Sequence, residues 1–141
     1  MLTTPESYMK VMPKTLESVH LDEKPRSKQL HCYQRLSGGA TSDRDYTLKV
    51  TWSVEETAQG KRYHREWSVD NAKGPEAKKD VVRVEKSDGS WTLEPLAGKK
   101  TAFTQQSYIE LGGSLWTVLA NTAVKEAARE IAESLRKELG S

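Results

Sequence analysis

Residues 40–52 read ATSDRDYTLKVTW and contain the most regular alternation of apolar and polar side chains in the chain. The apolar positions of this stretch are Tyr46, Leu48, Val50 and Trp52. Successive side chains of an extended chain point to opposite faces, so the alternation predicts a strand over residues 46–54 with one apolar face. Three consecutive charges precede this strand, and they are Asp43, Arg44 and Asp45.

Further strand-like segments lie on both sides of this stretch. The expected strands cover residues 16–21, 28–36, 62–69, 80–86, 90–96 and 101–111. Ser87-Asp88-Gly89 predicts a hairpin turn between two of them, because an Asp-Gly pair tolerates positive φ. Strands at short intervals, joined by tight turns, indicate a sequential antiparallel meander.

Both ends of the chain have helical patterns. Residues 4–6 read Thr-Pro-Glu, which is a typical helix start, and Pro13 ends a short N-terminal helix. After the Gly112-Gly113 pair, apolar residues recur every four positions over residues 115–139, which predicts one long amphipathic helix. About 25 residues make a rod of roughly 37 Å, long enough to lie across a sheet. The chain is therefore expected to be an α+β protein with about six strands.

The composition fits one globular domain and argues against several classes of partner. The chain has 141 residues, of which 35% are hydrophobic, and a mean hydropathy of −0.74. Its 22 basic and 20 acidic residues are interspersed, whereas a nucleic-acid-binding protein usually carries a basic patch. No apolar run reaches the roughly 18 residues that suggest a membrane-spanning helix, and the first residues do not read as a signal peptide.

Catalytic chemistry finds little support in the sequence. The three histidines are scattered, and none has the spacing of a metal ligand relative to Cys32, the one cysteine. Phosphate-binding loops, nucleophile elbows and H-E-x-x-H motifs are missing from the sequence. We therefore expect no catalytic residue, no metal and no cofactor.

Four stretches, in this order, resemble the START lipid-transfer family in its bacterial form. They are the Met-Pro ending of residues 5–13, Ser-Asp-Arg-Asp-Tyr at residues 42–46, Trp52, and the Gly112-Gly113 pair with Asn121. The resemblance covers nearly the whole chain and implies the helix-grip (SRPBCC, birch-pollen-allergen-like) fold. That fold is a curved antiparallel sheet wrapped around a long C-terminal helix. The family has prolines where this chain has Leu111 and Trp116.

The resemblance also implies a difference at the front of the chain. The family begins with a strand and a helix that this sequence lacks, so we expect a single START-like domain over residues 1–141 with an incomplete N-terminus; the alternative is a natural minimal version of the domain. A sheet without its first strand exposes an unpaired edge, which is a template for self-association. The chain as written is expected to be cytoplasmic, and an export leader would belong to the missing segment.

The fold implied by the resemblance has a cavity between sheet and helix, and alternation along the strands selects its lining. The candidate ligand-binding residues are Tyr46, Leu48, Val50, Trp52, Tyr63, Arg65, Trp67, Phe103, Gln105, Leu119 and Ala123. Arg65 is interpreted either as an anchor for a ligand's polar end or as a structural or rim residue, because a buried guanidinium needs a partner. Gln105 either anchors a ligand or faces solvent. A structural motif is assigned to Asp43, Arg44, Asp45, Gly112 and Gly113. The charged triplet either locks a corner, contacts a ligand head group or is simply solvated.

The resulting hypothesis is non-catalytic binding, and transfer, of a lipid or another hydrophobic small molecule. One alternative is an enzyme like the polyketide cyclases and dehydratases of the same superfamily, acting through Tyr63, Arg65 and Tyr108. The other is a protein-interaction module whose cavity is filled by side chains. Transient contact with a membrane surface fits the first reading, while nucleic acid is not an expected partner.

Overall fold

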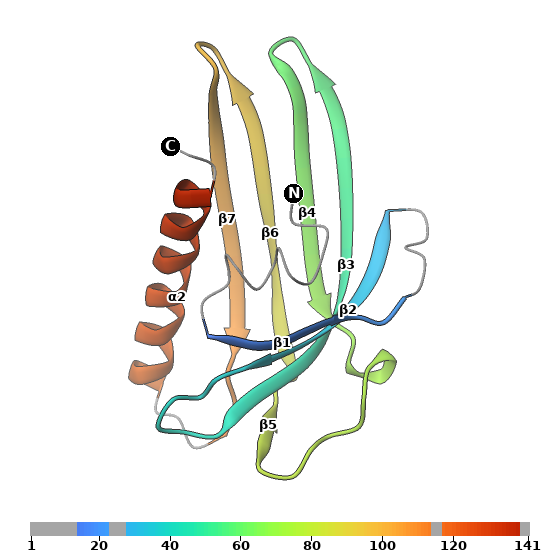
Figure 1. The fold of residues 1–141 in the computed structure, drawn as a ribbon, viewed down its shortest axis with the longest axis vertical. Coiled ribbons are helices and arrows are strands. Elements are labelled where there is room, and N and C mark those ends of the chain that lie inside the picture. The colour runs from blue at the N-terminus through green and yellow to red at the C-terminus, as the bar shows by residue number, and fades with distance from the viewer. Residues whose placement is uncertain (1–13, 23–27, 114–116, 139–141) are drawn as a thin grey trace.

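The computed structural model describes residues 14–22, 28–113 and 117–138; within the last range, side chains are described at 125, 126, 128–134, 136 and 137. The elements are β1 (Thr15–His20), β2 (Gln29–Leu36), β3 (Asp43–Thr57), β4 (Gly60–Val69), η1 (Asn71–Lys73), β5 (Val81–Arg83), β6 (Lys86–Leu96), β7 (Lys100–Glu110) and α2 (Thr117–Glu138). One long helix after an antiparallel sheet confirms the predicted α+β class (Figure 1). The expected short N-terminal helix lies outside the described residues.

The strands form a seven-stranded sheet in the order β1-β2-β3-β4-β6-β7. Each neighbouring pair on this path is antiparallel, as a meander requires. The seventh strand, β5, pairs in parallel with the start of β3, where Asp43 lies opposite Val81. A strand of three residues with a distant partner leaves no periodic signal, so the sequence did not reveal this pairing.

The hairpin predicted at Ser87-Asp88-Gly89 is wrong. β6 runs without interruption through these residues, and Asp88 lies opposite Tyr108 of β7. Gly89 does not form a turn but allows Trp67 and the backbone of Gln106 to approach β6 closely. A Cβ atom at this position would lie 2.5 Å from Cζ2 of Trp67 and 2.3 Å from the carbonyl oxygen of Gln106. A glycine inside a strand commonly marks such a contact.

The core lies on one face of the sheet. Its buried members are Leu30, Cys32, Tyr46, Leu48, Val50 and Val84. The register places Leu30 opposite Val50 and Cys32 opposite Leu48, so the alternating apolar positions of β2 and β3 meet on the same face. We call this the apolar face of the sheet and the opposite one the polar face.

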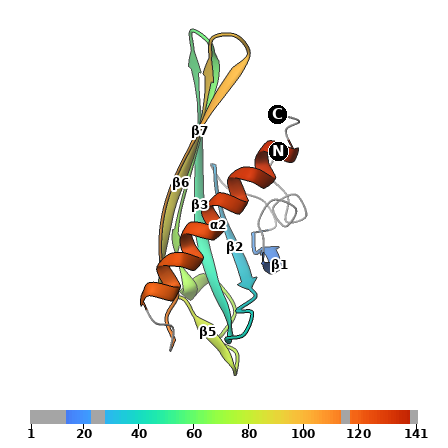
Figure 2. The ribbon, with the colours of Figure 1, turned by 90° about the vertical axis from the view of Figure 1, so that its left-hand side faces the viewer.

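The helix borders the sheet at its last strand. α2 runs alongside the outer edge of β7 (Figure 1), and its C-terminal end leans out of the sheet to the side on which β1 lies (Figure 2). The turns β3–β4 and β6–β7 lie together at one end of the sheet and project beyond α2 in both views. Within the described residues, no helix has the length and apolar character needed to span a membrane.

Candidate functional site

The strand register brings all the predicted binding residues of the sheet to the apolar face. Trp52 of β3 lies opposite Arg65 of β4, Arg65 opposite Trp91 of β6, and Trp91 opposite Gln105 of β7. Directly opposite residues of neighbouring strands point to the same face, so these four side chains form one row across the sheet. Segments separated by up to 53 positions in the sequence thus share one surface.

Two further rows flank this one. Nearer the hairpin turns, the row consists of Val54, Tyr63, Leu93 and Phe103. On the other side, the row consists of Val50, Trp67, Gly89 and Ser107. We call the half-exposed part of these three rows the aromatic surface; its members are Trp52, Val54, Tyr63, Arg65, Trp67, Leu93, Phe103 and Gln105, together with the buried Trp91 beneath it.

Aromatic rings contact one another along this surface. Trp67 and Trp91 meet edge to face, with ring centroids 6.1 Å apart at an interplanar angle of 82°. Trp91 continues to Phe103 at 5.7 Å and 74°. Edge-to-face pairs fix ring orientation, so the three rings form a semi-rigid wall that runs from β4 to β7. Trp91 was not selected from the sequence, although its alternation with Leu93 along β6 was the signal that could have found it.

Burial divides the predicted residues into two groups. Tyr46, Leu48 and Val50 are at most 7% exposed and belong to the core. Trp52, Trp67 and Phe103 are only partly buried, and Tyr63 is 49% exposed. The apolar face is therefore filled at its buried end by the protein's own side chains and remains accessible towards the hairpin turns. Contiguous accessible apolar area of this kind marks interaction sites in soluble proteins.

Two polar side chains stand among these rings. Arg65, half-buried, has a tryptophan as its register partner on each side, and Gln105 follows Trp91 in the same row. Burial raises the pKa of the Cys32 thiol, while its hydrogen bond with Ser18 and the nearby charge of Arg65 act in the opposite direction. An amide and a guanidinium within an aromatic surface are suited to hold the polar end of a largely apolar molecule.

The predicted helical members of the site fall on α2. Leu119 and Ala123 belong to this helix, but their side chains lie outside the described part of the structure. They remain a prediction.

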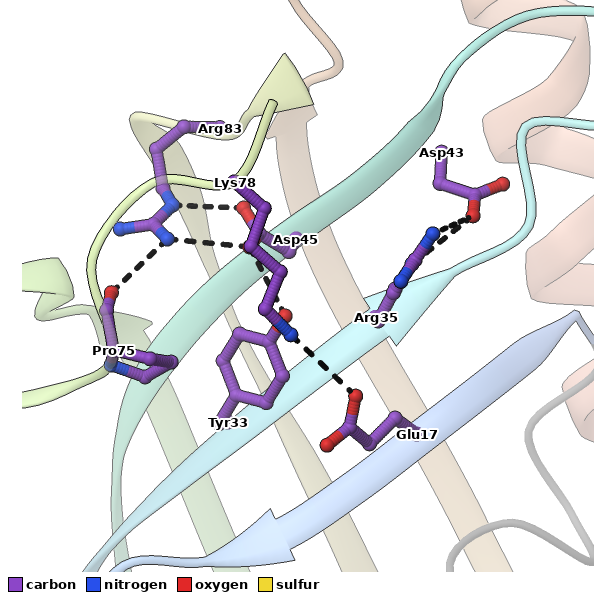
Figure 3. A network of polar contacts seen from close by, with 8 residues as sticks. All are labelled: Glu17, Tyr33, Arg35, Asp43, Asp45, Pro75, Lys78 and Arg83. Atoms are coloured by element: carbon purple, nitrogen blue, oxygen red, sulfur yellow. Dashed lines mark hydrogen bonds and ion pairs between the residues drawn. The ribbon is translucent and has the colours of Figure 1, made fainter. Parts of the chain in front are cut away.

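The charged triplet at the start of β3 makes contacts in three directions. Asp43 accepts hydrogen bonds from Nη2 of Arg35 at 2.7 Å and from the backbone of Gly38, and these contacts lower its pKa. Asp45 is fully buried and accepts from Nε of Arg83 at 2.7 Å (Figure 3). Arg44 points to the apolar face, since its register partner on β2 is Leu36.

The guanidinium of Arg44 binds backbone groups near the start of α2. Its Nε donates to the carbonyl oxygen of Leu111 and its Nη2 to that of Gly112, each at 3.3 Å. Its Nη1 donates to Thr41 Oγ1 at 2.6 Å. Gly112 and Gly113 have φ values of 64° and 71°, which glycine adopts without strain. These contacts join the start of β3 to the segment that leads into α2.

A network that sequence reasoning missed surrounds Asp45 on the polar face. The hydroxyl of Tyr33 donates to Asp45 Oδ2 at 3.0 Å, and Lys78 lies over the Tyr33 ring at 4.9 Å while approaching Glu17 at 3.8 Å (Figure 3). Burial is the main cause that raises the pKa of Tyr33. The residues of this network are distant from one another in the sequence, so no local motif predicts their contacts.

His31 has a carboxylate at each ring nitrogen. Nδ1 lies 3.3 Å from Asp22 Oδ2, and Nε2 lies 3.2 Å from Asp70 Oδ2. These contacts are on the polar face and tie β2 to the segments that follow β1 and β4. No group of three or more His, Cys, Asp and Glu side chains among the described residues has a metal-binding arrangement.

The polar face also carries a shallow groove of about 590 Å³. Most of its lining is charged or hydroxylated, including Lys49, Glu66, Asp88 and Tyr108. This polar lining distinguishes the groove from the aromatic surface, which lies on the other side of the same strands. The described residues thus present two chemically distinct surfaces on one sheet.

Solved structures of other proteins share this fold. The STAR-related lipid transfer protein of Xanthomonas axonopodis (fragment 25–204) superposes with a TM-score of 0.78 at 24% identity, covering 99% of this chain and 76% of that one. Human STARD10 gives 0.76 at 17%, covering 96% and 56%, and human StAR-related lipid transfer protein 5 gives 0.74 at 16%, covering 92% and 62%. No protein-family model matches the sequence, and no curated protein matches it.

These similarities define the class of fold. The chain has a START-like helix-grip fold, as the resemblance predicted. It spans little more than half the length of the two human chains. Two of these neighbours, the Xanthomonas axonopodis protein and human StAR-related lipid transfer protein 5, are named as lipid transfer proteins.

Proposed function

We propose that this protein binds a lipid or another hydrophobic small molecule against the aromatic surface, without catalysing a reaction. The proposal rests on the aromatic surface of the apolar face, where the rings of Trp67, Trp91 and Phe103 contact one another edge to face. Each Å² of apolar ligand surface removed from water contributes about 25 cal/mol. A ligand that buries several hundred Å² would therefore gain many kcal/mol without any chemical step.

Arg65 and Gln105 give such a ligand an orientation. An apolar chain lies along the rings, and its polar end meets the guanidinium or the amide in the same row. Residues Leu119 and Ala123 of α2 are proposed to cover the ligand from the other side. Two fold neighbours support this arrangement because their names describe lipid transfer. Transfer between membranes is the use we propose for the bound state.

Native mass spectrometry of the protein purified from cells tests binding directly. We expect an adduct whose mass disappears under denaturing conditions and whose organic extract contains a lipid. Trp67→Ala should lower the occupied fraction several-fold, because it removes part of the aromatic wall. Leu16→Ala is the matched control, since Leu16 is an exposed apolar residue of β1, away from that wall.

The variant Arg65→Gln tests the contribution of the polar anchor to binding separately from that of the aromatic wall. It should weaken the binding of ligands with an anionic or hydroxylated end while leaving binding of a plain hydrocarbon unchanged. Adduct-free wild-type protein that also fails to take up any member of a panel of phospholipids, sterols and fatty acids would overturn the proposal. Equal loss for the Trp67 and Leu16 variants would remove the aromatic surface as its site.

A further inference from the structure

The two hairpin turns form the outermost end of the molecule. The β3–β4 turn and the β6–β7 turn lie side by side and project beyond α2 (Figures 1 and 2). They are close enough to pack, since a Cβ atom on Gly60 would lie 3.7 Å from the ring of Pro95. We call residues 57–61 and 96–100 the hairpin tip.

Exposed apolar side chains gather at this end. Leu96 at the β6–β7 turn is 47% exposed, while Tyr63 and Val54 just below the turns are 49% and 38% exposed. Tyr63 lies opposite Val54 in the register, in the row of the aromatic surface nearest the tip. An apolar path thus leads from the tip onto the surface proposed to hold the ligand.

The charges of the tip are unevenly compensated. On the β3–β4 hairpin, Lys61 approaches Glu56 at 3.7 Å and Arg62 approaches Glu55 at 3.2 Å. On the β6–β7 hairpin, Lys99 and Lys100 are exposed, and neither makes an ion pair within the described part of the chain. The outermost turn therefore combines two uncompensated cations with an exposed leucine.

We propose that the hairpin tip docks on an anionic lipid bilayer. Lys99 and Lys100 contact the negatively charged head groups, and Leu96 enters the interface between head groups and acyl chains. Lysines near an anionic surface and apolar side chains in its interface both favour such adsorption. The strands then stand upright on the membrane, with Tyr63 and Val54 next to the surface. This inference rests on the proposed function, for which it supplies the point where a lipid enters or leaves.

Vesicle flotation with charge-matched variants tests the docking site. We expect wild-type protein to bind phosphatidylcholine vesicles containing 30% phosphatidylserine, and to bind less as salt screens the lysines. The double variant K99E/K100E should lose about tenfold or more of this binding. The control K73E/K79E makes the same charge change on η1 and the segment before β5, at the opposite end of the sheet, and should bind as wild type does. Leu96→Ser should weaken binding several-fold.

A fluorescent label reports the orientation independently. The thiol of Cys32 is buried, so an Ala97→Cys variant can be labelled selectively with an environment-sensitive dye at the β6–β7 turn. Its emission should shift to shorter wavelength on anionic vesicles, whereas a Glu76→Cys label should not respond. Absence of wild-type binding to anionic vesicles, or equal losses for the two double variants, would overturn the proposal. Vesicle binding by a protein that never carries a lipid would instead refute the proposed function and leave the docking site intact.

Discussion

Arg83 holds the buried carboxylate of Asp45 at two points, with Nε 2.7 Å from Oδ1 and Nη2 3.2 Å from Oδ2. Asp45 has no exposed area, and the pair joins β5 to the start of β3. The hydrogen bond to this carboxylate is the main cause that raises the pKa of the Arg83 guanidinium. Two-point contacts of this kind combine charge attraction with fixed geometry.

Removal of the arginine should therefore be costly. Arg83→Met leaves the Asp45 carboxylate buried without its cation, and we expect a loss of about 3 kcal/mol in the free energy of unfolding. The control is Arg62→Met, which breaks the exposed pair with Glu55 and should cost less than about 1 kcal/mol. Urea unfolding followed by circular dichroism measures both variants. Equal costs would show that the buried pair does not stabilise the fold.

Gly89 offers a steric test of the β6 register. Gly89→Ala places a Cβ atom against Trp67 and the backbone of Gln106, so we expect a destabilisation of about 3 kcal/mol from overpacking. Gly39→Ala meets no atom within 4 Å and bears only the strain of φ +60°, which should cost about 1 kcal/mol. Thermal unfolding of the two variants gives the comparison. A hairpin turn at Gly89 would instead predict similar costs for the two variants, because each alanine would then bear only the strain of a positive φ.

The pKa of Asp43 predicts a pH dependence. The backbone N–H of Gly38 and the guanidinium of Arg35 lower this pKa in the folded protein. The carboxylate thus contributes stability that is present above its unfolded pKa, near 3.9, and is lost as the pH falls through the folded value. The stability difference between wild type and Asp43→Asn should be largest near neutral pH and shrink below about pH 4. A difference that stays constant from pH 7 to pH 2 would contradict this assignment.

Gly112 and Gly113 are expected to act as the hinge of α2. Replacing both with alanine disfavours their positive φ values, and the added Cβ at residue 113 lies 3.3 Å from Nη2 of Arg44. We expect slower transfer of the co-purified ligand to acceptor vesicles, followed over time by mass spectrometry. Gly39→Ala, also at a positive φ but outside the hairpin tip and with no atom within 4 Å of the added Cβ, is the control. Transfer at the wild-type rate would exclude a hinge at this pair.

The sequence predicted the fold well where a single strand has a clear alternation of apolar and polar residues. The alternation from Tyr46 to Trp52 located β3, and the same pattern assigned the predicted sheet residues to one face before the register was known. The prediction failed at Ser87-Asp88-Gly89, where local turn propensity competed with a tertiary contact. The space left by Gly89 is occupied by Trp67, 22 positions earlier in the chain, and no local pattern contains that information.

The polar contacts were harder to predict than the strands. Arg83 and Asp45 come from segments whose pairing depends on β5, a strand too short for a periodic pattern. The contact of Arg44 with Leu111 likewise joins residues 67 positions apart that only the folded sheet brings together. Sequence reasoning could state that the triplet needs partners, since buried charges must be paired, but it could not name them.

The triplet at the start of β3 also carries information about the order of assembly. Asp43, Asp45 and Arg44 reach partners 8, 38 and 67 positions away, respectively. Bringing together the ends of a longer loop costs more chain entropy and is generally slower. The contact with Arg35 can form while only β2 and β3 exist, whereas the contact with Leu111 must wait until β7 has been added. The contact of Asp43 is therefore expected to form early and that of Arg44 late. A nascent chain that stops before β7 leaves the Arg44 guanidinium without the carbonyl groups that it binds in the complete fold.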